Sequence, residues 1–368
     1  MKKVEAVILC AKKKESLFPF SETKPTGLIP IVGKPIVEHL INSLEEAGIS
    51  KIHLVTNYKE EMFEAEFSDQ KNIDIVHQEE LTGTADAVES CDFVEDNFLV
   101  INGDVTVSSR DLTNIIEKQE KTDAKAVMLA TDQNKPEKFG VLSIEDDKVV
   151  EIEEKPEEAE NSLINTGIYA FSPEIFESIK DSESSDLTEA IKGFVSNEEA
   201  RFDLVEDYWS DIGSPEKLWK ADQQLRDSMI TETAVHEDAE VADSVEINGS
   251  AIIEPEAEIG PNVTLEGNCY IGENVHLKPG TVVEDSTVTQ GSILSDCNIS
   301  ETLVFEENII DPQVAVERTI LGEETDIKSG TVIRESFIGA RSFVDMNNSI
   351  RGIKFVPDAR TDLSEISK

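Results

Sequence analysis

The sequence predicts two domains: an α/β domain at residues 1–228, followed by a parallel β-helix. Three observations support this prediction. A length of 368 residues suits two domains better than one. Strand-like and helix-like segments alternate over the first part of the chain. In the second part, a branched apolar residue recurs at every sixth position, which is typical of a β-helix.

The first part begins with an apolar run of strand length at Val4–Leu9. Apolar residues at helical spacing predict a helix over 34–48, with Pro35 at its start and Gly48 at its end. Further strands are expected at Lys51–Thr56, Phe98–Ile101, Val127–Ala130 and Ile168–Phe171. This alternation predicts a mostly parallel sheet with helices on both faces, in which ligands bind beyond the carboxyl ends of the strands.

A polar stretch at 229–243 is predicted to be the linker, with the β-helix at 244–352 and a tail at 353–368. The register slips near Asp285 and Ser286 and returns at Leu321. An antiparallel sandwich is the alternative, but it would show a period of two in longer strands. Because a β-helix has open ends, we expect capping or oligomerisation. The unbroken run of sixth-position residues is Ile247, Ile253, Ile259, Leu265, Ile271, Leu277 and Val283.

The chain carries 77 acidic and 33 basic residues, a formal charge of -44. This charge excludes non-specific binding to nucleic acid and argues against docking on anionic lipid. The acidic residues are spread along the chain, where their repulsion destabilises a compact state unless it is screened. At molar salt the Debye length falls to about 3 Å. We therefore expect a cytoplasmic protein from a salt-accumulating cell; a merely acidic protein from an ordinary cell is the alternative.

The four cysteines lie in apolar patterns without a CxxC motif, so they are expected to be reduced core residues. The first apolar run is too short for a secretory signal, and no stretch is long enough to span a membrane.

Candidate chemistry follows the strands. The loop after the first strand holds Lys12, Lys13 and Lys14, which could attract polyphosphate as point charges, although a solvated basic turn is the favoured explanation of this loop taken alone. The run FLVINGD ends in Asp104, which is well placed to bind Mg²⁺, whereas Asn-Gly-Asp is also ordinary turn chemistry. A second carboxylate, Asp211, lies in YWSDIGSP.

Other polar residues also lie at the ends of expected elements. Gln78 could bind the edge of a base, and Gly83 precedes an expected helix and lets a flat ring approach the backbone. Glu154 and Lys155 follow a strand of alternating pattern, and Asn165, Thr166 and Gly167 precede another. Taken singly, each of these residues is more often structural than functional.

In order and spacing, these segments resemble the sugar-1-phosphate nucleotidyltransferases that carry a C-terminal left-handed β-helix of hexapeptide repeats. The resemblance covers nearly the whole chain, through VILCA, FPFSETKPTGLIPIVGKPIVEHLI, QEELTGTADAV, LVINGD, NTGIYAFSPEIF and YWSDIGSPEKLWKA. It implies a Rossmann-like nucleotidyltransferase domain with a mixed sheet. It also implies transfer of a nucleotidyl group from a nucleoside triphosphate to a hexose 1-phosphate, with release of pyrophosphate.

The resemblance assigns Mg²⁺ to Asp104 and Asp211, and catalytic roles to Lys155, Asp104 and Lys24. The substrate-binding residues that it implies are Gln78, Gly83, Thr84, Gly140, Glu154, Asn165 and Thr166. The sequence departs from the family in its first loop, where the G-x-G-T-R pattern is replaced by Lys12 to Ser16. A family lysine is also replaced, by Thr26. Losing such donors typically costs about 10²–10³-fold in rate.

Two hypotheses follow. The first is a working Mg²⁺-dependent enzyme, with UTP or dTTP as the favoured triphosphate and UTP weakly preferred because of Gly-Thr-Ala. The second is a non-catalytic regulatory or scaffold paralogue that binds a sugar nucleotide and assembles with an active relative. We expect a homo-oligomer through the β-helix or a hetero-oligomer with such a paralogue. Acetyl transfer on the β-helix would need a general base, for which His276 is the one histidine of that region.

Overall fold

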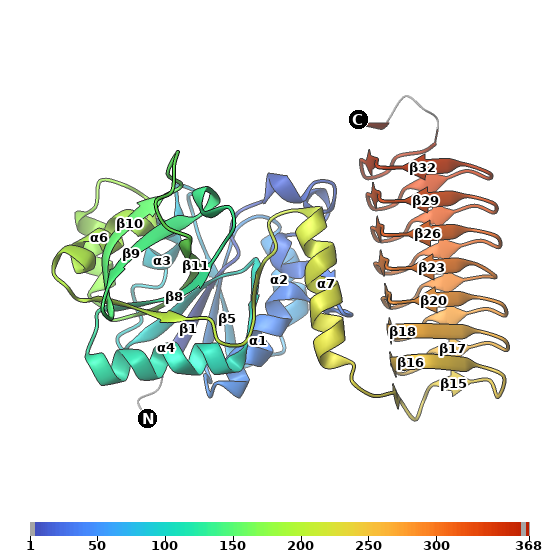
Figure 1. The fold of residues 1–368 in the computed structure, drawn as a ribbon, viewed down its shortest axis with the longest axis horizontal. Helices are drawn as coiled ribbons and strands as arrows, with labels where there is room; N and C mark the ends of the chain where they lie inside the picture. Colours follow the sequence, from blue (N-terminus) through green and yellow to red (C-terminus); the bar gives the residue numbers. More distant parts are fainter. Residues whose placement is uncertain (1–3, 362–365, 368) are drawn as a thin grey trace. The chain divides into compact units, whose positions relative to one another are not determined.

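The computed structural model describes residues 4–361 and 366–367, which form two compact units (Figure 1). The first unit comprises Met1–Lys13, Pro25–Leu28 and Ile36–Asp211. The second unit comprises Lys14–Lys24, Ile29–Pro35 and Ile212–Lys368. Two segments near the start of the chain therefore belong with the β-helix, although 200 residues separate them from it in sequence.

A nine-stranded sheet forms the centre of the first unit. The five strands expected from the sequence are all present. In spatial order the sheet contains β5 (Ile73–His77), β4 (Ile52–Thr56), β1 (Glu5–Leu9), β6 (Phe98–Asn102), β11 (Leu163–Phe171), β8 (Ala126–Asp132), β12 (Ala200–Leu204), β10 (Lys148–Glu154) and β9 (Gly140–Glu145).

Strands β5, β4, β1 and β6 are parallel, but β11 runs antiparallel to both β6 and β8. Strands β10 and β9 are also antiparallel, as are β10 and β12. The sheet is mixed, as the family resemblance implied, and the expectation of a mostly parallel sheet was wrong for its second half. Apolar patterns identify a strand, but they do not fix its direction.

Helices cover both faces of this sheet, as predicted. Residues of β6 alternate between the two cores: Leu99 and Ile101 pack in one, Phe98 and Val100 in the other. The predicted helix at 34–48 is α1, which begins after Pro35 and ends before Gly48. The first core contains residues of α1 (Ile36–Glu46), α2 (Glu60–Phe67) and α4 (Ser109–Thr122), and the second contains residues of α3 (Thr84–Glu89), α5 (Ile175–Asp181) and α6 (Leu187–Ser196).

The second unit is built on a left-handed parallel β-helix, which confirms the predicted fold. One face is the sheet of β15 (Glu240–Val241), β17 (Glu258–Ile259), β19 (His276–Leu277), β22 (Ile293–Leu294), β25 (Ile309–Ile310), β28 (Asp326–Ile327) and β31 (Phe343–Val344). The larger sheet contains β14 (Ala234–Val235), β16 (Glu246–Ile253), β18 (Thr264–Ile271), β20 (Val282–Glu284), β21 (Thr287–Val288), β23 (Asn298–Ser300), β24 (Leu303–Val304), β26 (Ala315–Glu317), β27 (Ile320–Leu321), β29 (Val332–Arg334), β30 (Phe337–Ile338), β32 (Ser349–Arg351), β33 (Lys354–Phe355) and β34 (Ile366–Ser367).

The sixth-position residues of the sequence fill the interior of this coil. Those from Ile253 to Val283 are buried, and Ile247 at the start is partly buried against the same core. The register slip has a structural cause. Leu265 pairs with Val283, eighteen residues on, whereas Val283 pairs with Ile299, sixteen residues on. The coil therefore shortens at Asp285, which turns the corner with a φ of 42°.

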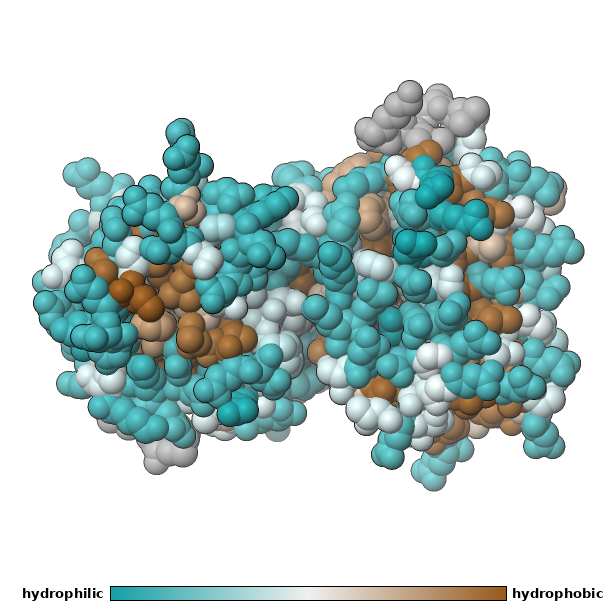
Figure 2. Space-filling view, viewed as in Figure 1, coloured by the Kyte–Doolittle hydropathy of each residue, from teal (hydrophilic) through white to brown (hydrophobic). Residues whose placement is uncertain are grey.

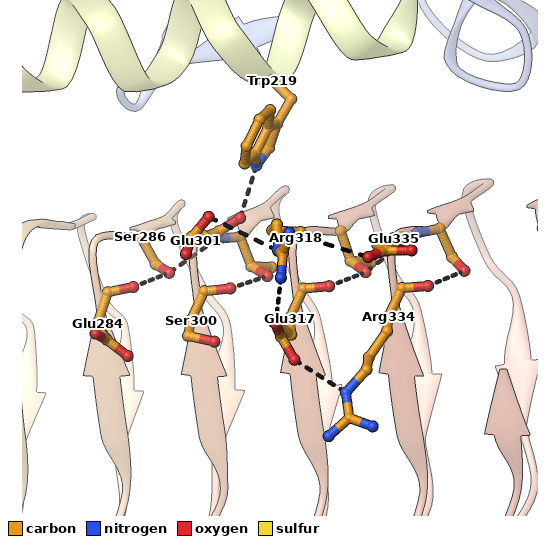
Figure 3. A network of polar contacts seen from close by, with 12 residues as sticks. Trp219, Glu284, Ser286, Ser300, Glu301, Glu317, Arg318, Arg334 and Glu335 are labelled. Carbon is orange, nitrogen blue, oxygen red and sulfur yellow. Dashed lines mark hydrogen bonds and ion pairs between the residues drawn. The ribbon is translucent and has the colours of Figure 1, made fainter. Parts of the chain in front are cut away.

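Polar groups at this corner connect one coil to the next (Figure 3). The Ser286 hydroxyl donates to the Glu284 carbonyl at 2.6 Å and accepts from the Thr302 amide at 3.0 Å. The indole of Trp219, on α7 (Pro215–Met229), donates to the carbonyl of Glu301 at 2.6 Å. This hydrogen bond attaches helix α7 to the corner of the β-helix at Glu301.

A buried ion pair strengthens this attachment. Arg226 and Asp222 on α7 lie 2.6 Å apart and are 2% and 1% exposed. Asp222 also accepts from the hydroxyl of Thr287 at 3.0 Å and from the amide of Val32 at 2.9 Å. One carboxylate therefore joins α7, a strand of the β-helix and the segment Ile29–Pro35 within the second unit.

The predicted linker and tail are shorter than expected. Strands β14 and β15, inside 229–243, pair with β16 and β17, so the first coil begins within the predicted linker. Strand β33, inside the predicted tail, continues the coil by pairing with β30. Part of the tail, at 362–365 and 368, lies outside the described residues. Val235 and Val241 continue the six-residue spacing upstream of Ile247, but the polar residues around them made this stretch resemble a linker.

The four cysteines are free and buried, as predicted. Within the described part of the chain, no helix combines the length and apolar character needed to cross a membrane. Hydrophilic side chains cover most of the visible surface in Figure 2, interrupted by small apolar patches. This surface agrees with the composition.

Candidate functional site

The backbone segments that carry the two aspartates of the candidate site lie side by side. Strand β6 ends at Asn102, and Asp104 follows directly before β7 (Val105–Val107). Strand β13 (Trp209–Asp211) runs antiparallel to β7, with Asp211 opposite Val105. This pairing brings Asp211 next to Asp104 across a sequence separation of about one hundred residues. Both aspartates are half-buried.

Close packing supports the loop that carries Asp104. The amide of Gly103 donates to the carbonyl of Leu9 at 2.9 Å, and a side chain at Gly103 would collide with the sulfur of Cys10. A Cβ at Gly27 would lie 3.3 Å from the same sulfur. Burial raises the pKa of the Cys10 thiol, and the negative charge of Asp104 raises it further. Cys10 is therefore a neutral packing residue beside the carboxylate.

The segment Asn165–Gly167 lies inside β11, not before it as expected. The pairing of β11 with β8 shifts register between Asn165 and Tyr169, which marks a β-bulge. Gly167 has a φ of +80°, and a side chain there would meet Asn102 at the end of β6. The bulge therefore lies beside the loop of Asp104.

Hydrogen bonds fix the bulge in one conformation. The amide of Asn165 donates to the phenol oxygen of Tyr169 at 2.5 Å, and its carbonyl oxygen accepts from Gly167 N–H at 3.1 Å. The hydroxyl of Thr166 donates to the carbonyl of Leu129 at 2.8 Å. Burial raises the pKa of Tyr169, so this phenol stays protonated. Asn165 is thus oriented by the chain itself.

The end of the β9–β10 hairpin holds the charged pair predicted for the sugar phosphate. The ammonium of Lys155 lies 2.8 Å from one carboxylate oxygen of Glu154, and 65% of the Lys155 side chain is exposed. A Cβ at Gly140 would lie 3.0 Å from the other oxygen of Glu154. The ring of Phe139 contacts that of Trp209 at 6.2 Å, which connects this hairpin to the strand of Asp211.

The Gly-Thr-Ala segment, residues 83–85, packs against other parts of the chain, whereas the sequence led us to expect an open surface for a base. A side chain at Gly83 would collide with the carbonyl of Ser185, so backbone packing occupies the space that we had assigned to a flat ring. Thr84 accepts from the amide of Leu187 at 3.1 Å. The side-chain amide of Gln78 is 3% exposed and donates to the carbonyl of Gly83 at 3.3 Å.

Lys24 belongs to the second unit, where its ammonium lies 2.9 and 3.0 Å from the two carboxylate oxygens of Glu306. The structure therefore gives Lys24 a partner on the β-helix. His276, on the same β-helix, lies 2.8 Å from Glu258.

From the sequence we named Lys13 as a possible polyphosphate contact but missed the side chains after β4 that it meets. The ammonium groups of Lys13 and Lys59 both lie over the ring of Tyr58, at 5.9 and 5.7 Å from its centroid. Nearby, Glu60 accepts from the hydroxyl of Thr56 at 2.6 Å and lies 2.9 Å from His77. The sequence did contain a signal for this group, because the polar run NYKEE at 57–61 directly follows an apolar strand of the parallel half of the sheet.

The residues present fit a divalent cation. Two neighbouring carboxylates supply the hard oxygen donors that Mg²⁺ prefers, and Mg²⁺ is usually held by one or two carboxylates plus substrate phosphates and water. Among the residues that the structure describes, no group of three or more His, Cys, Asp and Glu side chains is arranged as a metal cage. The donor set therefore suits a cation that arrives with a phosphate ligand.

The chain belongs to the nucleotidyl transferase family, whose model matches residues 5–228. Residues 241–338 match a second family, the GMPPB C-terminal domain. Together these matches include both units and confirm the resemblance found in the sequence.

Individual relatives match about three fifths of the chain. The bifunctional protein GlmU of Methanocaldococcus jannaschii is 36% identical over 236 residues, covering 62% of this chain and 56% of its own length. The UTP–glucose-1-phosphate uridylyltransferase AglF of Haloferax volcanii is 30% identical over 237 residues, covering 61% of this chain and 97% of its own. The chain thus spans little more than half the length of its GlmU relatives.

A solved structure described as a glucose-1-phosphate thymidylyltransferase from Bacillus anthracis aligns with a TM-score of 0.58 and 25% identity. It covers 61% of this chain and 96% of that chain. The alignment supports the same fold for the first part of the protein.

Proposed function

We propose that the protein transfers a nucleotidyl group from a nucleoside triphosphate to a hexose 1-phosphate, giving a sugar nucleotide and pyrophosphate. The single observation that carries the proposal is the pairing of β7 with β13, which brings Asp211 beside Asp104 in a chain of this family. UTP or dTTP is the favoured triphosphate. The uridylyltransferase and thymidylyltransferase among the similar proteins support this choice of base.

In the proposed reaction, an oxygen of the sugar 1-phosphate attacks the α-phosphorus in line with the departing pyrophosphate. The chain contributes position and charge, and no covalent enzyme intermediate is needed. Asp104 and Asp211 would hold Mg²⁺, which neutralises phosphate charge when it is bound. Lys155 binds the sugar phosphate as a mobile cation, because its side chain is largely exposed.

The remaining site residues orient the substrates. Asn165, fixed by Tyr169, and Thr166 bind the sugar phosphate beside the Asp104 loop. Gly140 leaves space next to Glu154, whose carboxylate accepts from the sugar hydroxyls. Of the residues that the resemblance assigns to the base, Gln78 binds it in this proposal, since the backbone of Ser185 fills the space at Gly83 and Thr84 accepts from the amide of Leu187. Because the Gln78 amide donates to Gly83 in this structure, base binding exchanges that bond for one to the nucleotide.

Pyrophosphate release tests the proposal. Purified protein in molar KCl with Mg²⁺ is given UTP or dTTP with glucose 1-phosphate, and pyrophosphate is measured. We expect release with at least one pair, and loss of release in Asp104→Asn. Asp69→Asn, at an exposed turn after α2, is the matched control and should retain full activity. Absence of release with every common triphosphate and every hexose or hexosamine phosphate would contradict the proposal.

A further inference from the structure

The proposed function leaves a chemical gap in the first loop. The loop lacks the glycines and the arginine that the family places against the triphosphate, so the phosphate-binding groups must be other side chains of this loop and of the loops beside it. The acidic surface makes this gap severe, because 77 acidic residues repel a polyanion. A triphosphate therefore needs local cations at the edge of the sheet where it enters.

Two cations meet at that edge. Lys13 follows β1, and Lys59 follows β4, the strand that pairs in parallel with β1. Both ammonium groups lie within 6 Å of the centre of one ring, Tyr58, so they are less than about 12 Å apart.

The backbone holds this arrangement in place. The amide of Tyr58 donates to the carbonyl of Ala11 at 3.0 Å, and the amide of Cys10 donates to the carbonyl of Val55 at 2.8 Å. These bonds attach the loop after β1 to the loop after β4 directly before the two lysines. Because Gly103 in turn donates to Leu9, the same end of β1 also contacts the loop of Asp104.

The conformation of Lys59 is also unusual. Its φ of 52° and ψ of 44° are left-handed, at the residue before α2. Glycine or asparagine would fill a left-handed position with less strain than lysine does. The chain nevertheless places a lysine there, with its ammonium over Tyr58.

We propose that Lys13 and Lys59, steered by the ring of Tyr58, form the triphosphate clamp of this protein. The inference rests on the proposed function and deepens it by naming the residues that bind the β- and γ-phosphates. The electron-rich face of the Tyr58 ring attracts the ammonium groups of both lysines and keeps them at the same edge of the sheet. Lysines act as separate point charges, so the clamp needs no glycine-rich backbone.

Binding of inorganic tripolyphosphate and of UTP, measured by calorimetry, tests the clamp without requiring turnover. We expect Lys13→Gln and Lys59→Gln each to weaken both ligands by about tenfold, and the double variant to weaken them further. Lys118→Gln is the matched control. Lys118, on α4, also lies over an aromatic ring, that of Phe202 on β12. This control should bind both ligands like the unmodified protein.

The outcomes separate the clamp from the proposed function. Weaker binding in the two clamp variants supports the clamp, whether or not pyrophosphate is released. Binding that matches the Lys118→Gln control would overturn the clamp even in an active enzyme. Absence of any tripolyphosphate or UTP binding by the unmodified protein would overturn it as well. In an active enzyme, we further expect the KM for UTP to rise about tenfold, with the KM for the sugar phosphate unchanged.

Discussion

The buried Asp222–Arg226 pair gives the sharpest prediction about stability. The variant Asp222→Ala leaves the guanidinium of Arg226 buried without its carboxylate, since Arg226 is 2% exposed. Removing one partner of a buried pair typically costs about 3–5 kcal/mol. The amide of Val32 and the hydroxyl of Thr287 lose their acceptor in the same variant. We therefore expect a cost near the upper end of this range.

Urea unfolding measures this cost. The chain contains two tryptophans, so in a Trp209→Phe background the fluorescence of Trp219 reports on the second unit alone. With a slope of about 2 kcal/mol/M, a loss of about 4 kcal/mol lowers the urea midpoint by about 2 M. The measurement belongs in molar KCl, where surface repulsion is screened.

Two variants control the interpretation. Asp227→Ala, on the same helix, removes one exposed hydrogen bond to Asn268 and should cost about 1 kcal/mol or less. The double variant Asp222→Ala/Arg226→Ala removes both charges and should recover part of the loss. A midpoint for Asp222→Ala that equals that of Asp227→Ala would refute the reasoning.

Three further predictions follow from the thiols, the bulge and the surface charge. Burial raises the pKa of Cys91, Cys269 and Cys297 from 9.0 to about 12, 11 and 12. As the pH rises, these thiols therefore ionise in the unfolded chain before they ionise in the folded protein. The free energy of unfolding falls by about 1.4 kcal/mol per thiol for each pH unit between 9 and 11. Urea midpoints from pH 8 to 11 measure this fall, which should shrink in Cys91→Ala; an equal slope in that variant would contradict the assignment. Tyr169→Phe removes the partner of Asn165 and should raise the KM for the sugar 1-phosphate about tenfold, while an unchanged KM would show that Asn165 needs no support. The melting temperature should rise between about 0.1 M and about 1 M KCl as the repulsion of a charge of -44 is screened, and a constant value would argue for the ordinary acidic protein.

The period of six predicted the β-helix well, because each inward position requires a branched apolar residue. The slip at Asp285 also had a structural counterpart, the change from eighteen to sixteen residues between paired positions. The boundaries were less predictable. The coil's first strands carry Val235 and Val241, which continue the spacing of six, but the polar residues around them led to the prediction of a linker there.

Long-range contacts limited the prediction of the site. Strand alternation located Asp104, but the antiparallel pairing that brings Asp211 beside it depends on residues about one hundred positions apart. Gly83 was expected to let a flat ring approach the backbone, but the group that lies against it is Ser185 of the chain itself. Lys13 was named from the sequence, but its convergence with Lys59 over Tyr58 was missed, since the two lysines meet only when β1 and β4 pair.

The neighbouring aspartates are the centre of the proposed function, and cation binding tests them most directly. Calorimetric titration of Mn²⁺, used in place of Mg²⁺, is performed with UTP present on the unmodified protein, Asp104→Asn, Asp211→Asn and the exposed control Asp69→Asn. We predict one cation site in the unmodified protein and the control, and loss of that site in each of the other two variants. Undiminished binding in either Asp104→Asn or Asp211→Asn would contradict a cation shared by the two carboxylates.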